Sequence, residues 1–214
     1  MDTVWVLERV AEDHPALGID DPLDGRGVSE PSDPAGRLVD PGVPPGPPLA
    51  QGSTPDAQLL RDFGAAFRPP GPEATAALDR FTAQPDLEGY ALAHQWLALI
   101  WAEELGHRLP PDVLAREQRI EAQVRAELAE HPELPIDLWA ELTALLAQHG
   151  GGLDEAARQQ ALCRVVGTAE AEGVWRGDGT YAQRYAGGSF DITAEPEHVT
   201  ALMTWLLAAL VRPA

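Results

Sequence analysis

The chain has 214 residues, a formal net charge of −19 at pH 7, one cysteine and no lysine. Without lysine, a Schiff-base lysine, a P-loop lysine and a lysine general base are all excluded. A strongly acidic surface repels phosphate and anionic lipid, so we expect neither a nucleic-acid partner nor a membrane partner. Cys163 stands alone, so no intramolecular disulfide can form.

The amino-acid usage favours a bacterial, cytoplasmic protein. Lysine and asparagine, whose codons begin with AA, are both missing, which is typical of a GC-rich bacterial genome. The apolar run VWVL at 4–7 is too short for the core of a signal peptide and is flanked by acids. The run at 199–211 is shorter than the roughly 18 residues that a membrane-spanning helix requires. We therefore expect a cytoplasmic location.

Residues 1–56 differ in composition from the rest of the chain. They contain eleven acids and three arginines, together with turn-forming segments such as DPLDG, DPAG and PGVPPGPP. Their apolar content is too low for a core of their own, so we predict an extended or disordered acidic arm rich in Pro and Gly. Residues 57–214 are expected to form a helical-hairpin domain.

From Thr54 onward the apolar residues recur at helical spacing. Proline and capping residues mark the starts of the helices, and Gly and Pro mark their ends. Gly106 is expected to end one helix, and Thr193 to cap the last. The pattern predicts an all-α fold of about seven helices. The expected ranges are 53–67, 71–83, 87–106, 110–131, 135–151, 153–173 and 195–211.

Two kinds of helix alternate along the chain. The segment 87–106 is apolar on almost every face, and the segments 135–151 and 195–211 are similarly apolar. The segments 110–131 and 153–173 are amphipathic and charged. We predict inner apolar helices and outer amphipathic helices arranged as hairpins. WAEELGHRLPPDVLAREQ and LLAQHGGGLDEAARQQ align at a spacing of about 44 residues, which suggests a hairpin repeat.

A Gly-rich segment, GVWRGDGTY, leads into HVTALMTWLLAAL near the C-terminus. Over roughly residues 86–211 this arrangement resembles the "DG-x-W … H-x-T" style of repeat in α/α-toroid proteins, the architecture of terpene cyclases, prenyltransferases and glycan lyases. The acidic DxDD-type signature of the cyclases is absent. The resemblance therefore implies an architecture rather than an activity.

His94 and Gln95 are the only strongly polar side chains within the apolar stretch YALAHQWLALIW, and Tyr90 and Trp101 lie on the same helical face as His94. Burial among aromatic neighbours favours the neutral imidazole, which could act as a general base. The alternative is a core histidine that is hydrogen-bonded to a carbonyl or a threonine.

The loop at 174–194 concentrates residue types that are common in ligand sites, and it could contain a hairpin. Loops that carry aromatic and charged residues are disproportionately functional. The alternative is a surface connection whose aromatic residues cover the helix ends. The candidate residues are Trp175, Arg176, Asp178, Tyr181 and Tyr185.

Two Glu-x-x-His pairs, at Glu104/His107 and Glu195/His198, match the pattern of di-iron helical bundles. The first pair straddles Gly106, and the second begins immediately before Pro196. We interpret both as charges that suit helix ends and predict no metal site. No phosphate-binding loop, nucleophile elbow, zinc-spaced Cys/His set or dinucleotide fingerprint is present, so no cofactor is expected.

The sequence leaves three functions open, and it does not indicate the oligomeric state. The first, favoured by the acidic arm and the lack of a catalytic motif, is a non-enzymatic helical protein that binds a protein partner or a small ligand. The second is an α/α-toroid type of enzyme that acts on an apolar or sugar-like small molecule. The third is an acidic mimic that occupies a basic nucleic-acid-binding protein. The enzyme would use His94, Asp178, Tyr181 and His198 as an acid–base site, with ligand contacts from Tyr90, Trp101, Trp175, Arg176 and Tyr185.

Overall fold

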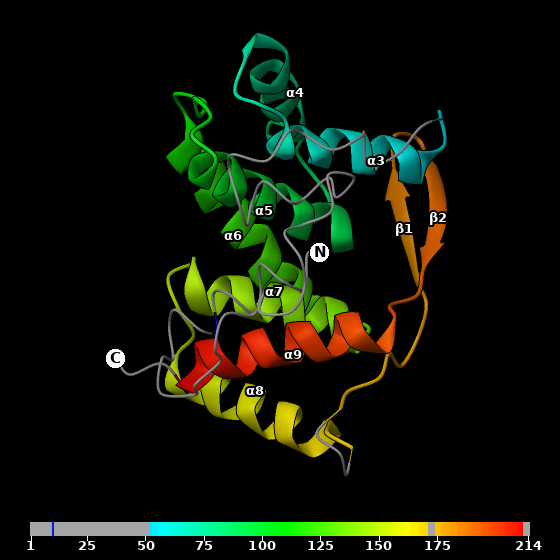
Figure 1. Cartoon of the computed structure of the whole chain (residues 1–214). Helices are drawn as coiled ribbons and strands as arrows, with labels where there is room; N and C mark the ends of the chain where they lie inside the picture. Colours follow the sequence, from blue (N-terminus) through cyan, green and yellow to red (C-terminus); the bar gives the residue numbers. More distant parts are fainter. Residues whose placement is uncertain (1–9, 11–51, 171–173, 212–214) are drawn as a thin grey trace, which may run out of the picture. The chain divides into compact units, whose positions relative to one another are not determined.

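The structure, a computed structural model, describes residues 10, 52–170 and 174–211. The acidic arm expected at 1–56 therefore lies almost entirely outside the described residues. Within them the chain forms seven α-helices, one short 3₁₀ helix and a two-stranded sheet, which confirms the all-α prediction (Figure 1). Their contacts divide into two compact units. We call residues 52–127 and 182–191 the first unit, and the described residues of 128–181 and 192–211 the second.

The first unit surrounds one apolar helix. Its helical elements are α3 (Pro55–Phe63), η2 (Gly64–Phe67), α4 (Pro72–Thr82), α5 (Gly89–Glu104) and most of α6 (Val113–Glu130). The first three of these elements all contact α5, which is buried on nearly every face. This burial follows from the sequence of α5, because a helix without a polar face has to be enclosed.

The first amide groups of α5 obtain partners from other elements. Helix starts leave backbone N–H groups without intrahelical acceptors, and buried ones need a substitute. Gly89 N donates to Glu127 Oε1 at 3.2 Å, and Ala91 N donates to Gln183 Oε1 at 3.2 Å. Glu127 lies near the end of α6, so α5 and α6 run antiparallel as the predicted hairpin requires.

The loop at 174–194 contains the hairpin that the sequence left open, formed by β1 (Tyr181–Tyr185) and β2 (Gly188–Ile192). Ala186 and Gly187 make its two-residue turn, both with positive φ, as the twist of a tight hairpin favours. A Cβ at Gly188 would lie 2.4 Å from Pro55 Cγ. Only glycine at this position therefore lets β2 approach the start of α3 so closely.

The second unit is built from α7 (Ile136–Gln148), α8 (Glu155–Thr168) and α9 (Pro196–Val211). In Figure 1, α9 lies along α7 and also contacts α8. Helices α7 and α9 are largely buried, whereas α8 buries only Ala161 and Val165 among its residues. The alternation of apolar and amphipathic helices that the sequence predicts is thus confirmed in the burial of the helices.

The direction of α8 follows from hydrogen bonds at its two ends. Arg158, near its start, donates to the Leu210 carbonyl near the end of α9, at 2.9 Å. Trp175 Nε1 donates to the Val165 carbonyl at 3.0 Å, and the Trp175 backbone exchanges hydrogen bonds with Thr200 near the start of α9. Helix α8 therefore runs antiparallel to α9.

Two helix ends can be compared with their predictions. The end at Gly106 is confirmed: its φ is +73°, and His107 N donates to the Ala102 carbonyl in a Schellman arrangement. Thr193 is not the cap of α9, because the helix begins at Pro196 and its first backbone bond is accepted by Glu195. The Thr193 hydroxyl instead pairs with that of Thr180 at 2.9 Å.

No helix in the described part of the chain is both long and apolar enough to cross a membrane.

Candidate functional site

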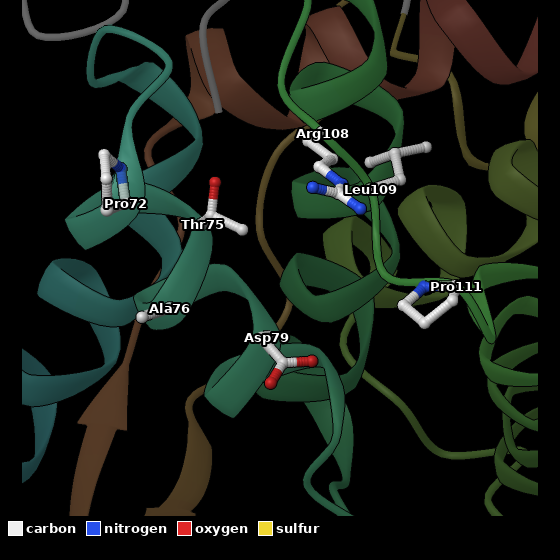
Figure 2. Close-up of a pocket in the computed structure, with 7 residues that line it drawn as sticks. All are labelled: Pro72, Thr75, Ala76, Asp79, Arg108, Leu109 and Pro111. Atoms are coloured by element: carbon white, nitrogen blue, oxygen red, sulfur yellow. The ribbon is translucent and has the colours of Figure 1, made fainter.

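A groove of about 580 Å³ lies in the first unit between α4 and the connection that joins α5 to α6. Figure 2 shows the residues of α4 on one side and those of the connection on the other. We call it the α4 groove. It is lined by Pro72, Thr75, Ala76 and Asp79 from α4 and by Arg108, Leu109 and Pro111 from the connection.

The α4 wall is held in place by Arg116, from the first turn of α6. Its Nη2 lies 2.7 Å from Asp79 Oδ1, and its Nη1 donates to the Asp79 carbonyl and to Thr82 Oγ1, both at 2.9 Å. Its Nε donates to Asp112 Oδ1 at 3.0 Å. The hydrogen bond from Arg116 lowers the pKa of the Asp112 carboxyl. One guanidinium thus joins α4 to the end of the α5–α6 connection.

The last turn of α4 is fixed by two further side chains. Gln95 Nε2 donates to the carbonyls of Phe81 and Gln84 at 2.8 and 3.0 Å. Arg119 donates to the carbonyls of Thr82 and Gln84 at 2.7 and 2.8 Å. Carbonyls at a helix C-terminus lack intrahelical partners, so these donors satisfy and anchor that end. Gln95, fully buried in α5, therefore has a structural role.

The opposite wall is equally constrained. Just after the Gly106 turn, His107 Nε2 lies 3.0 Å from the carbonyl oxygen of Ala66, so this nitrogen carries the proton and donates it. Val113 N donates to the Pro110 carbonyl at 3.1 Å, closing a turn before α6. The ring of Pro111 also fixes the backbone there. Arg108 is therefore presented from a connection anchored on both sides.

The groove is mostly apolar, with few polar groups. Pro72, Ala76, Leu109 and Pro111 supply apolar surface. The Thr75 hydroxyl, the Asp79 carboxylate and the Arg108 guanidinium supply the polar atoms. Asp79 forms an ion pair with Arg116 through Oδ1, whereas Arg108 makes no hydrogen bond or ion pair with any described residue.

The sequence-predicted residues of the first unit do not line this groove. His94 stacks on Phe63, with ring centroids 4.4 Å apart and 14° between the planes. Tyr90 lies farther off, at 6.5 Å from the His94 ring. Trp101 is fully buried and packs against Phe63 and Phe67, each at 5.1 Å. His94 is thus one member of an aromatic cluster that joins α3, η2 and α5.

Tyr185 belongs to a separate polar network in the first unit. Its hydroxyl donates to Asp62 Oδ2 at 2.9 Å and accepts from Gln84 Nε2 at 3.1 Å. Gln58 Nε2 donates to both Asp62 oxygens. Burial raises the pKa of the Tyr185 phenol, which stays protonated and acts as a donor to Asp62.

In the second unit, the loop residues contact helix ends. Trp175 is buried and donates its indole N–H to the Val165 carbonyl. Asp178 Oδ1 accepts from Ile136 N at 2.9 Å, which satisfies an amide at the start of α7 and places a negative charge there. Arg176 forms an ion pair with Glu170 at 3.0 Å. These contacts give all three residues structural partners.

The four residues of the predicted acid–base site fall in both units. His94 belongs to the first, whereas Asp178, Tyr181 and His198 belong to the second. Burial lowers the pKa of His198 to about 4, so its imidazole is neutral at pH 7. Tyr181 opens β1 and is half-buried. The acid–base site stays a prediction.

No group of three or more His, Cys, Asp or Glu side chains in the described ranges is arranged to hold a metal ion. His107, from the first Glu-x-x-His pair, and the buried Glu127 of α6 both have other contacts. His107 uses Nε2 to bind the Ala66 carbonyl, and Glu127 accepts from the start of α5. Glu141 lies fully buried in α7.

Glu141 is the most unusual ionisable group of the second unit. Only 1 % of it is exposed, and neither carboxyl oxygen has a hydrogen-bond partner among the described residues. Asp137, one turn earlier on α7, is 2 % exposed. Desolvation, with a smaller contribution from Asp137, raises the pKa of Glu141 to about 8. Its carboxyl is therefore largely protonated at pH 7, which avoids a buried, unpaired charge.

Sequence reasoning did not predict the groove residues Thr75, Asp79 and Arg108. The Pro110–Pro111 pair indicated only the turn after Gly106 and the start of the next helix. A signal was nevertheless present, because an arginine fixed between a helix-ending glycine and two prolines is presented by a stiff connection. What that arginine would face depends on α4, almost thirty residues earlier, and no local pattern contains this information.

Comparison of the chain with protein families, with curated proteins and with solved structures finds no match.

Proposed function

We propose that this protein is a non-enzymatic helical protein that binds a small ligand in the α4 groove. The observation that carries the proposal is Arg108: its guanidinium has no partner among the described residues and lies at a mostly apolar groove of about 580 Å³. Small-molecule sites typically have volumes of about 300–1,000 Å³ and combine apolar walls with a few fixed polar groups. The α4 groove has both properties.

The rigidity of the groove supports binding. Arg116, Arg119 and Gln95 hold α4, while His107 and the proline turn hold the connection. Preformed walls reduce the ordering that a ligand would otherwise have to impose, and this raises the affinity that a given set of contacts can provide.

The dimensions favour a small molecule over a protein partner at this site. A stable protein interface buries about 800 Å² on each partner, contributed by about 20–30 residues. Seven of the described residues line the α4 groove. The enzyme and the acidic mimic stay alternatives from sequence, because no contact within either unit specifically favours them. A bacterial cytosol is the setting that the composition suggests for this proposal.

The test is a fragment screen followed by nuclear magnetic resonance with ¹⁵N-labelled protein. Compounds that bind should shift the amide resonances of residues 73–79, 105–109 and 112, since the prolines at the groove have no amide proton. Ala76 is exposed and lines the groove, so the bulk of Trp in Ala76→Trp should block these shifts. The matched control is Glu73→Trp, which adds the same side chain to an exposed position of α4 outside the groove.

The proposal gains support if Ala76→Trp abolishes binding and Glu73→Trp leaves it intact. It is overturned if no fragment shifts the groove resonances, or if the shifts persist in Ala76→Trp.

A further inference from the structure

The charges of the α4 groove identify a class of ligand, on the premise that the groove binds a small molecule as proposed above. We infer that the ligand is a monocarboxylate with an apolar body. Its carboxylate binds the Arg108 guanidinium, and its body rests against Pro72, Leu109 and Pro111. This inference goes beyond ligand binding as such, because it specifies the charge and the polarity of what the groove accepts.

Among the residues that the structure describes, Arg108 is the one available cation at the groove. Of the seven described residues that line it, no other carries a positive charge. The neighbouring Arg116 uses Nε for Asp112, Nη2 for the Asp79 carboxylate and Nη1 for Asp79 O and Thr82. Its side chain is only 12 % exposed. A ligand anion therefore has Arg108 as its cationic partner.

The charge balance limits that anion to a single negative charge. Among the described residues that line the groove or are joined through Arg116, Arg108 and Arg116 contribute two positive charges, and Asp79 and Asp112 contribute two negative ones. A dianion would meet one free guanidinium and the carboxylate of Asp79. Its second charge would be uncompensated and repelled. A monoanion needs only Arg108.

The chemistry of the guanidinium favours a carboxylate as that monoanion. The planar fork of an arginine matches the two carboxylate oxygens and binds them through two parallel N–H···O bonds. Thr75 adds a hydroxyl from the α4 side, opposite the connection that carries Arg108 (Figure 2). The proline and leucine walls provide apolar contact but no hydrogen-bond donors, so they suit an apolar body.

The test compares four small molecules that share a phenyl ring: phenylacetate, phenylacetamide, phenethylamine and phenyl phosphate. Each is titrated into the full-length protein at pH 7.5, and the dissociation constant is obtained from the shifts of groove resonances. Phenylacetate should bind at least tenfold more tightly than the neutral amide and the amine. Phenyl phosphate, mostly a dianion at this pH, should bind more weakly than phenylacetate.

Two variants assign the effect to Arg108. Arg108→Gln should weaken phenylacetate binding at least tenfold and leave phenylacetamide binding within twofold. Arg68→Gln removes the same charge from another exposed position of the first unit outside the groove and should change neither. Both residues are exposed, so neither variant is expected to impair folding.

The outcomes separate the two proposals. If phenylacetamide binds the groove as tightly as phenylacetate and Arg108→Gln changes nothing, the carboxylate inference is wrong while ligand binding in the groove stands. Tighter binding of phenyl phosphate or phenethylamine also overturns the inference. If none of the four probes shifts a groove resonance, the carboxylate inference fails, and the fragment screen decides separately on the proposed function.

Discussion

Arg116 and Asp79, 37 residues apart in the sequence, form a 2.7 Å ion pair that fixes the two walls of the α4 groove relative to each other. The same guanidinium also binds Asp112, at the end of the opposite wall, at 3.0 Å. The width of the groove therefore depends on one largely buried side chain that is itself not part of the lining.

The first prediction concerns this link. Arg116→Gln should lower the free energy of unfolding by about 2–3 kcal/mol, because hydrogen bonds to charged groups are each worth about 1.5–3 kcal/mol and several are lost together. Urea denaturation measures the change. It should also weaken ligand binding in the α4 groove, because α4 loses its connection to Asp112.

Arg125→Gln is the matched control for this prediction. Arg125 lies on the same helix and forms an i,i+4 pair with Glu121, but its side chain is 43 % exposed. Removal of such a pair should cost less than about 0.5 kcal/mol. Equal destabilisation by the two variants would contradict the special role of Arg116.

The second prediction separates a structural role of Tyr185 from a role in ligand binding. Tyr185→Phe removes the hydrogen bonds with Asp62 and Gln84 but keeps the ring that packs edge-on against Phe81. The free energy of unfolding should fall by about 1 kcal/mol, since two half-buried polar groups each lose a hydrogen bond. Ligand binding in the α4 groove should stay unchanged. A loss of binding without a loss of stability would restore Tyr185 as a ligand contact.

The third prediction compares two glycines. Gly188→Ala would place a Cβ 2.4 Å from Pro55 Cγ, and the rigid proline ring cannot move aside freely. We expect a loss of about 1–3 kcal/mol, typical of overpacking. Gly167→Ala lies in α8 with open space around the new Cβ and should stabilise the protein by about 1 kcal/mol, the helix propensity difference. Thermal unfolding should show a lower midpoint temperature for Gly188→Ala and a higher one for Gly167→Ala. If both variants are destabilised, the packing argument is wrong.

The fourth prediction concerns pH. The pKa of Glu141 is raised by burial from its ordinary value of 4.5 to about 8. The folded state therefore binds this proton more tightly than the unfolded state. The associated stability is fully present below pH 4.5 and is lost as the pH rises toward 8.

His198 changes the folding stability in the opposite direction, and it does so over a lower pH range. Burial lowers its pKa from 6.5 to about 4, so its contribution is present above pH 6.5 and is lost as the pH falls toward 4. Between pH 6.5 and 8 only Glu141 of these two groups changes. Stability should fall there by about 2 kcal/mol, since one pKa unit corresponds to about 1.4 kcal/mol.

Urea denaturation at a series of pH values tests this. In Glu141→Gln the decrease between pH 6.5 and 8 should disappear, while in the exposed control Glu130→Gln it should remain. Persistence of the decrease in Glu141→Gln would show that another group causes it.

Much of the fold could be predicted because its signals are local. The apolar stretch from Tyr90 to Trp101 predicted a buried helix, and α5 is buried. Helix starts at Pro55 and Pro72 and the end at Gly106 followed from backbone preferences of single residues. Thr193 shows the limit of this reasoning, because Pro196 supplied a competing start signal nearer the helix. The proposed repeat of about 44 residues stays a prediction.

The candidate site was not predictable in the same way. The sequence drew attention to aromatic and charged residues of the loop at 174–194, but Trp175, Asp178 and Tyr185 have partners in α8, α7 and α3. The sequence showed only that Arg108 lies on a stiff connection between Gly106 and two prolines, and its significance depends on having no partner among the described residues. Whether a side chain has a partner depends on every element near it, so a pattern within one segment cannot decide it.

Within the described residues, the sequence was enough to predict seven helices, their approximate ends and which of them are buried, because helical periodicity and backbone preferences act over a few residues. The tertiary structure alone decided how the polar side chains are used: that Gln95 and Arg119 would hold the end of α4, that Glu141 would be left without a partner, and that Arg116 would join Asp79 to Asp112. Such contacts join residues far apart in the chain. Their energies depend on distance and burial, which exist only after the helices have packed.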